Sequence, residues 1–250
     1  MRARLLDDLL DTKPHPLAAS LEVWLGSRRF AAFVRDHLPK VRKKLRGAQN
    51  PDSARDLLLE LETAYRLTLD KRLSVTYEPT PGGESRGPDL SVRFTTRVEF
   101  MVEVTRLKGR LAEASFAASH GVDARRLAGV LALKLGQTVA DRANVLMVGT
   151  DGRPPSSEEL DSLLKEVRRD AETTDPEALL RKGFRHRGEY LRRLERLSAV
   201  LVRRAPSLET AETEPGAALW LNAHARTPLP NDVRAVLMGA LDGDKSSHEL

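Results

Sequence analysis

Residues 87–107 read GPDLSVRFTTRVEFMVEVTRL and contain two runs that are typical of neighbouring β-strands. The first run, Asp89 to Phe94, alternates apolar and polar side chains, and the second extends from Val98 to Leu107. The short connection between them predicts a hairpin. Upstream, Leu73 to Tyr77 alternates in the same way. Three strands that follow one another in this manner predict an antiparallel meander.

Helical and strand patterns on either side of the meander predict an α/β fold. Residues 1 to about 70 have helical spacing of their apolar side chains, and a clear helix opens at Pro51. A further helix is predicted over about Val122 to Ala140, and Asn144 to Gly149 is typical of a buried strand. The expected core is therefore a mixed sheet, flanked by the helix that contains Glu62 and the helix that contains Lys134.

The length of 250 residues suits one enlarged domain or two small ones. We expect an N-terminal helical region over 1–50, a core over 51–150, and a C-terminal extension over 151–250 that completes or decorates the core. The extension contains patterns for two helices and two strands, at residues 156–171, 197–202, 217–221 and 232–241.

Two acidic residues stand on neighbouring strands of the predicted meander. Asp89 begins one strand, and Glu103 lies near the end of the next. A hairpin brings such positions together, and two converging carboxylates form an oxygen-rich site for Mg²⁺ or Mn²⁺. The strand around Glu103 is apolar on both faces, so its carboxylate needs either an ion or a partner such as an arginine at the sheet edge.

The motif Gly87-Pro88-Asp89, followed by Glu103-Val104-Thr105, resembles that of the PD-(D/E)XK nuclease superfamily. The order of elements over about residues 55–150 is also similar to the core of that superfamily. The resemblance implies a restriction-endonuclease-like fold and metal-dependent hydrolysis of phosphodiester bonds in DNA or RNA. It assigns the metal to Asp89 and Glu103.

The resemblance also implies an acidic helix residue before the first strand and a lysine beside the metal. Glu62 matches the acidic position best, and Glu60 is the alternative. Thr105 stands where the family has its lysine, and threonine supplies no positive charge. Lys134, three residues before a glutamine, is the preferred replacement, and Lys108 is the other candidate.

The substitution at Thr105 leaves three hypotheses open. The first is an active nuclease with catalytic residues Glu62, Asp89, Glu103 and Lys134. The second is a catalytically degenerate relative that acts as a nucleic-acid-binding or protein-interaction module. In the third, both short motifs occur by chance, and Lys134 is a solvated residue of an amphipathic helix.

The charge distribution favours a polyanionic partner. The chain has 41 Lys and Arg against 36 Asp and Glu, and basic residues dominate at 28–46 and at 181–204. Such clusters suit a phosphate backbone, in which case binding weakens steeply with salt, or they are solvated helix faces.

Other sequence features limit the location and the chemistry. The absence of cysteine excludes disulfides and thiolate metal sites. Asp7 and Asp8 interrupt the position of a signal peptide, and no stretch approaches the roughly 18 apolar residues of a membrane span. We therefore expect a cytoplasmic protein without membrane association. The sequence leaves the oligomeric state open.

Overall fold

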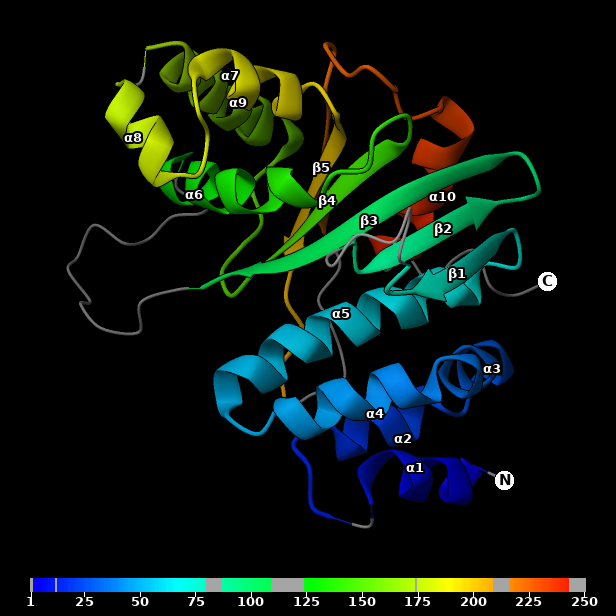
Figure 1. The fold of residues 1–250 in the computed structure, drawn as a ribbon. Helices are drawn as coiled ribbons and strands as arrows, with labels where there is room; N and C mark the ends of the chain where they lie inside the picture. Colours follow the sequence, from blue (N-terminus) through cyan, green and yellow to red (C-terminus); the bar gives the residue numbers. More distant parts are fainter. Residues whose placement is uncertain are drawn as a thin grey trace.

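The computed structural model describes residues 2–11, 13–79, 87–108, 124–173, 175–208 and 216–242. A six-stranded mixed sheet forms the centre of the molecule, and helices lie on both of its faces (Figure 1). The α/β fold class and the N-terminal helical region predicted from the sequence are confirmed.

The strands follow one another across the sheet in chain order, β1-β2-β3-β4-β5-β6. β1, β2 and β3 pair in antiparallel fashion and form the predicted meander, whereas β3, β4 and β5 are parallel and β6 is antiparallel to β5. The strand bounds are Leu73–Tyr77, Leu90–Phe94, Val98–Leu107, Ala143–Thr150, Leu197–Arg204 and Ala217–Leu221. Residues 151–250 thus contribute two strands to the same sheet as the expected core.

One face of the sheet packs against the N-terminal helices. They are α1 (Arg2–Leu10), α2 (Ala18–Trp24), α3 (Arg28–Asp36), α4 (Leu38–Gly47) and α5 (Pro51–Leu69). The long helix α5 lies directly along the sheet (Figure 1) and shares one buried apolar cluster with alternate residues of β3 and β4, such as Val102 and Met147. Helix α10 (Asn231–Leu241) contributes to this cluster too. The other alternate residues of the strands point to the opposite face.

The opposite face is covered by α6 (Ala124–Lys134), α7 (Ser157–Thr173), α8 (Pro176–Arg181) and α9 (Arg187–Leu194). These helices share a second buried cluster with Leu146 and Val148 of β4. The sheet is therefore flanked by the helix of Glu62 on one side and the helix of Lys134 on the other, as predicted.

The helix expected over Val122 to Ala140 is shorter at its C-terminal end than the sequence indicated. α6 ends at Lys134 and a single 3-10 turn continues to Gln137. The amide side chain of Asn144 exchanges two hydrogen bonds of 2.9 Å with the backbone of Val139, which removes that residue from any helix. Residues 122 and 123 lie outside the described ranges.

Within the ranges that the structure describes, no helix combines the length and the apolar character that a membrane span requires.

Candidate functional site

The two acidic residues of the sequence motif lie side by side. β2 and β3 pair so that Leu90 faces Val102, which sets Asp89 opposite Glu103 in the next position of the register. Oδ2 of Asp89 accepts a hydrogen bond of 2.8 Å from the backbone N–H of Val104. This bond fixes the direction of the Asp89 carboxylate at the point where the strand pairing begins.

Glu60 of α5 supplies a third carboxylate to the same place. Burial raises the pKa of Glu60 to about 7, and the charge of Asp89 contributes to the increase against the opposing effect of Lys44. Glu60 and Asp89 also both raise the pKa of Glu103. Carboxylates from α5, from the start of β2 and from β3 therefore form one acidic cluster, which we define as Glu60, Asp89 and Glu103.

Glu62, which was the preferred acidic helix residue, lies away from the acidic cluster. Glu62 forms a buried ion pair with Arg203 of β5, and its other oxygen lies 2.6 Å from Nε of Arg66. Residues two apart on a helix point about 200° apart, so Glu60 and Glu62 cannot serve the same site. The carboxylate beside Asp89 is that of Glu60, the alternative in the sequence analysis.

Lys44 of α4 neutralises part of the acidic cluster. Its Nζ lies 2.6 Å from Glu60, 3.1 Å from Glu78 and 3.6 Å from Asp89. Burial by itself would lower the pKa of Lys44, but the carboxylates of Glu60 and Asp89 outweigh burial and raise the pKa above its usual value. The sequence does not distinguish Lys44 from the other basic residues of the run at 28–46, which was expected to contact a phosphate backbone or solvent.

Lys134 lies beside Glu103, where the sequence analysis expected a positive charge. Its Nζ is 2.5 Å from Oε1 of Glu103. Burial nevertheless raises the pKa of Glu103 to about 8, and the charge of Asp89 adds to this effect, whereas Lys134 opposes it. The other candidate lysine, Lys108, pairs with Asp56 of α5 at 3.0 Å.

A small cleft lies on the Glu103 side of this cluster. Glu103, Lys134 and Gln137 line it together with Pro88 and Thr138. Within the described residues, Oε2 of Glu103 and Oε1 of Gln137 are buried without a hydrogen-bond partner. A buried carboxylate oxygen that lacks a partner is costly unless a cation or a water molecule binds it.

The donor atoms suit a hard divalent cation. Glu103 offers its unpaired oxygen, and Oδ1 of Asp89 lies 3.6 Å from Lys44, which is too far for a hydrogen bond. In the described part of the chain, no three His, Cys, Asp or Glu side chains lie close enough together to hold a metal ion. Mg²⁺ commonly binds through only one or two carboxylates and completes its shell with water and substrate phosphate. Asp89 and Glu103 would supply two such carboxylates.

Comparison of the chain with models of protein families, with curated proteins and with solved structures finds no match in any of the three. The sequence motif and the geometry of the acidic cluster carry the proposal that follows.

Proposed function

We propose that this protein is a metal-dependent phosphodiesterase of the PD-(D/E)XK type, which hydrolyses DNA or RNA. The observation that supports it is the convergence of Glu60, Asp89 and Glu103 from three elements on one acidic cluster, in which a buried oxygen of Glu103 has no hydrogen-bond partner among the described residues. This convergence coincides with the order of elements, helix, three strands, helix and strand, that the motif resemblance implies.

Charge balance explains why a divalent cation and a phosphate belong together here. Glu60, Glu78, Asp89 and Glu103 oppose the two ammonium groups of Lys44 and Lys134, which leaves two negative charges when all are ionised. An anionic phosphodiester is repelled by such a site. Two added positive charges remove that repulsion.

Each residue then has a distinct role. Asp89 and Glu103 would hold Mg²⁺ or Mn²⁺, which supplies a Lewis acid and a more acidic water when bound. The Lys134 ammonium donates hydrogen bonds to the phosphate from the α6 side. It thereby replaces the family's lysine, whose position is occupied by Thr105 in this chain. Glu60 holds Lys44 in place at 2.6 Å.

The test is an assay of hydrolysis on single-stranded, duplex and branched DNA and RNA, with Mg²⁺, with Mn²⁺ and with EDTA. We expect products only with a divalent cation, and no products from Asp89→Asn. Intact substrates under every condition, with a folded protein, would contradict the proposal.

A second candidate is the catalytically degenerate relative, a binding module for nucleic acid or for another protein. It is favoured by the contacts of Lys44 and Lys134, since both lysines neutralise the carboxylates without any metal. Binding of nucleic acid that is unchanged by Mn²⁺ and never followed by hydrolysis would support this candidate over the nuclease.

A further inference from the structure

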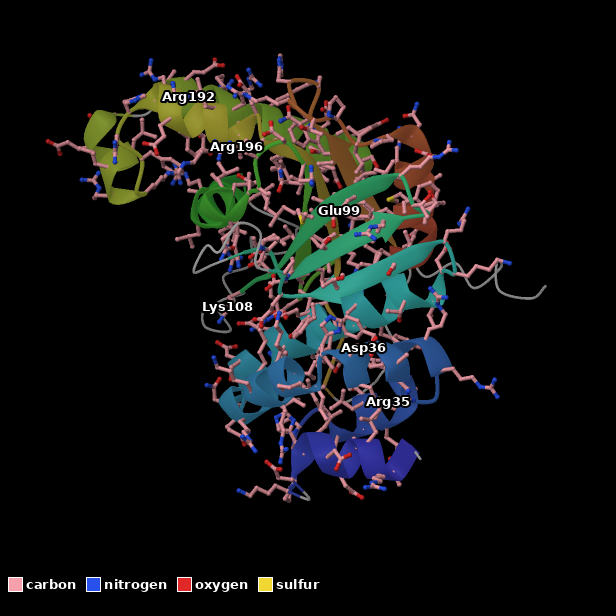
Figure 2. All side chains as sticks on the ribbon, turned by 45° about the vertical axis from the view of Figure 1, so that its right-hand side comes forward. Arg35, Asp36, Glu99, Lys108, Arg192 and Arg196 are labelled. Atoms are coloured by element: carbon pink, nitrogen blue, oxygen red, sulfur yellow. The ribbon has the colours of Figure 1, made fainter. Side chains whose placement is uncertain are left out.

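Helix α9 and its flanks form a pocket rich in arginine. Arg185, Arg192, Arg193, Arg196 and Arg226 line the pocket, and Glu189 is the single acidic residue among its lining side chains in the described part of the chain. Figure 2 shows Arg192 and Arg196 in the part of the molecule that contains α7 and α9, on the other side of the sheet from Arg35 of α3. The pocket therefore concentrates positive charge on that side of the sheet.

Two of these guanidinium groups, those of Arg193 and Arg226, form ion pairs with glutamates. Glu189 is satisfied by Arg193 at 2.7 Å and by the backbone N–H of Arg185 at 2.8 Å. Arg226 lies 3.3 Å from Glu195, outside the pocket lining. Among the described residues, the side chains of Arg185, Arg192 and Arg196 form no ion pair. A concave surface with unpaired guanidinium groups is suited to bind phosphate, which arginine contacts through two parallel hydrogen bonds.

The basic run at 28–46 differs from this pocket, because internal contacts engage most of its charges. Arg29 donates to the backbone oxygens of Thr68 and Leu73. Lys40 donates to the backbone oxygens of the last residue of β1 and of the residue that follows it. The other engaged cations pair with acids: Arg42 and Arg46 with Asp11, Lys44 with Glu60. The sequence suggested two basic clusters as sites for nucleic acid. The cluster around α9 thus has more basic side chains that are available to contact phosphate.

The pocket adjoins the candidate active site. Leu135 and Thr138, in the turn that follows α6, line both the arginine pocket and the cleft of Glu103 and Lys134. A ligand with a single phosphate would fill only one of the two places. A strand carries several phosphates in succession, so it can present one phosphate to each place.

We propose that the arginine pocket binds backbone phosphates of a polynucleotide strand whose neighbouring phosphodiester lies at the acidic cluster. This inference rests on the proposed function, and it names the surface that holds the strand beside the site of hydrolysis. The contact is with the phosphate backbone, so it carries no preference for base sequence.

The test is fluorescence anisotropy with a labelled oligonucleotide of about 20 nucleotides, in EDTA so that hydrolysis cannot occur. The double variant Arg192→Gln/Arg196→Gln is compared with Arg35→Gln/Arg234→Gln, which removes the same charge from exposed positions on α3 and α10. We expect the pocket variant to bind at least about tenfold more weakly at about 0.1 M salt, with a salt slope reduced by about one to two units. The control variant should bind much as the wild type does.

Equal losses in the two double variants would overturn the inference, because they would reflect net charge alone. Displacement of the oligonucleotide by inorganic phosphate at equal phosphate concentration would also overturn it, because a strand that presents several phosphates to the arginine side chains gains affinity over a single phosphate. A selective loss in the pocket variant supports the inference even if the wild type never hydrolyses the strand with Mn²⁺, in which case only the proposed nuclease activity fails.

Discussion

The carboxylate of Asp89 accepts a hydrogen bond of 2.8 Å from the backbone N–H of Val104. The bond joins the residue that precedes β2 to the strand that carries Glu103, so the backbone itself aims the acidic side chain. A carboxylate held in this way is oriented before a cation binds, which lowers the entropic cost of binding. Asparagine at this position keeps the oxygen that accepts the hydrogen bond and removes the negative charge. The substitution therefore separates the structural role of Asp89 from its proposed role in binding a cation.

The first prediction is that Asp89→Asn abolishes cation binding while leaving the fold intact. We expect Mn²⁺ affinity to fall by more than about a hundredfold, since the loss of a second-shell partner alone costs about 10–100-fold. Calorimetric titration with Mn²⁺ measures the effect. Asp161→Asn, which removes an exposed carboxylate on α7, is the matched control. Equal heats from wild type and Asp89→Asn would show that Asp89 does not bind the cation.

The second prediction concerns the lysine that the acidic cluster already holds. Lys44→Met should tighten Mn²⁺ binding at least about tenfold, because an ammonium group no longer competes for Glu60 and Asp89. The same change should lower the free energy of unfolding without metal by about 1–3 kcal/mol, since it leaves buried carboxylates without their partner. Lys43→Met changes an exposed neighbour, and we expect it to alter neither Mn²⁺ affinity nor the free energy of unfolding. Weaker Mn²⁺ binding by Lys44→Met would mean that Lys44 positions the carboxylates instead of competing for them.

The third prediction is a pH dependence of stability without metal. The pKa of Glu103 rises from an ordinary value of 4.5 to about 8 in the folded chain, so the folded state binds this proton more tightly than the unfolded state does. Its contribution to stability is complete below about pH 4.5 and is lost as the pH rises towards 8.

Relative to wild type, Glu103→Gln should therefore gain about 1–3 kcal/mol between pH 5 and pH 8, since one pKa unit corresponds to about 1.4 kcal/mol. Urea unfolding in EDTA across this range provides the measurement. Parallel curves for the two proteins would indicate that the Glu103 carboxyl titrates normally.

The fourth prediction separates Glu62 from the acidic cluster. Glu62→Gln breaks a buried ion pair with Arg203, in which both side chains are only 2% exposed, and should cost about 3–5 kcal/mol of unfolding free energy. Mn²⁺ affinity should stay at the wild-type value, whereas Glu60→Gln should change it. A Glu62→Gln protein that is fully stable but weak in Mn²⁺ binding would restore the role that the sequence analysis gave to Glu62.

The fifth prediction addresses the position where the resemblance fails. Thr105→Lys restores the charge of the family motif on β3, two residues after Glu103. If Lys134 already supplies that charge, the hydrolysis rate will not increase, and Lys134→Met will be the variant that loses activity. A rate increase in Thr105→Lys would instead identify Thr105 as a degenerate position.

The sheet and half of the site were predictable because they depend on local patterns. Period-two alternation located β1, β2 and β3, and the short hairpin between β2 and β3 placed Asp89 beside Glu103. The choice between Glu60 and Glu62 was not predictable, because it depends on a partner far away in the sequence. The role of Lys44 was hidden for the same reason, since only the packing of α4 against α5 brings it to Glu60.

The buried pair of Glu62 and Arg203 also has a consequence for the order of folding during synthesis. Its two members are 141 residues apart, which at about 5–20 residues per second corresponds to roughly 7 to 30 s of translation. Until β5 emerges from the ribosome, Glu62 lies in an apolar helix face without Arg203. We therefore expect α5 and the first four strands to remain incompletely packed on the ribosome. They should pack fully only after β5 has paired with β4.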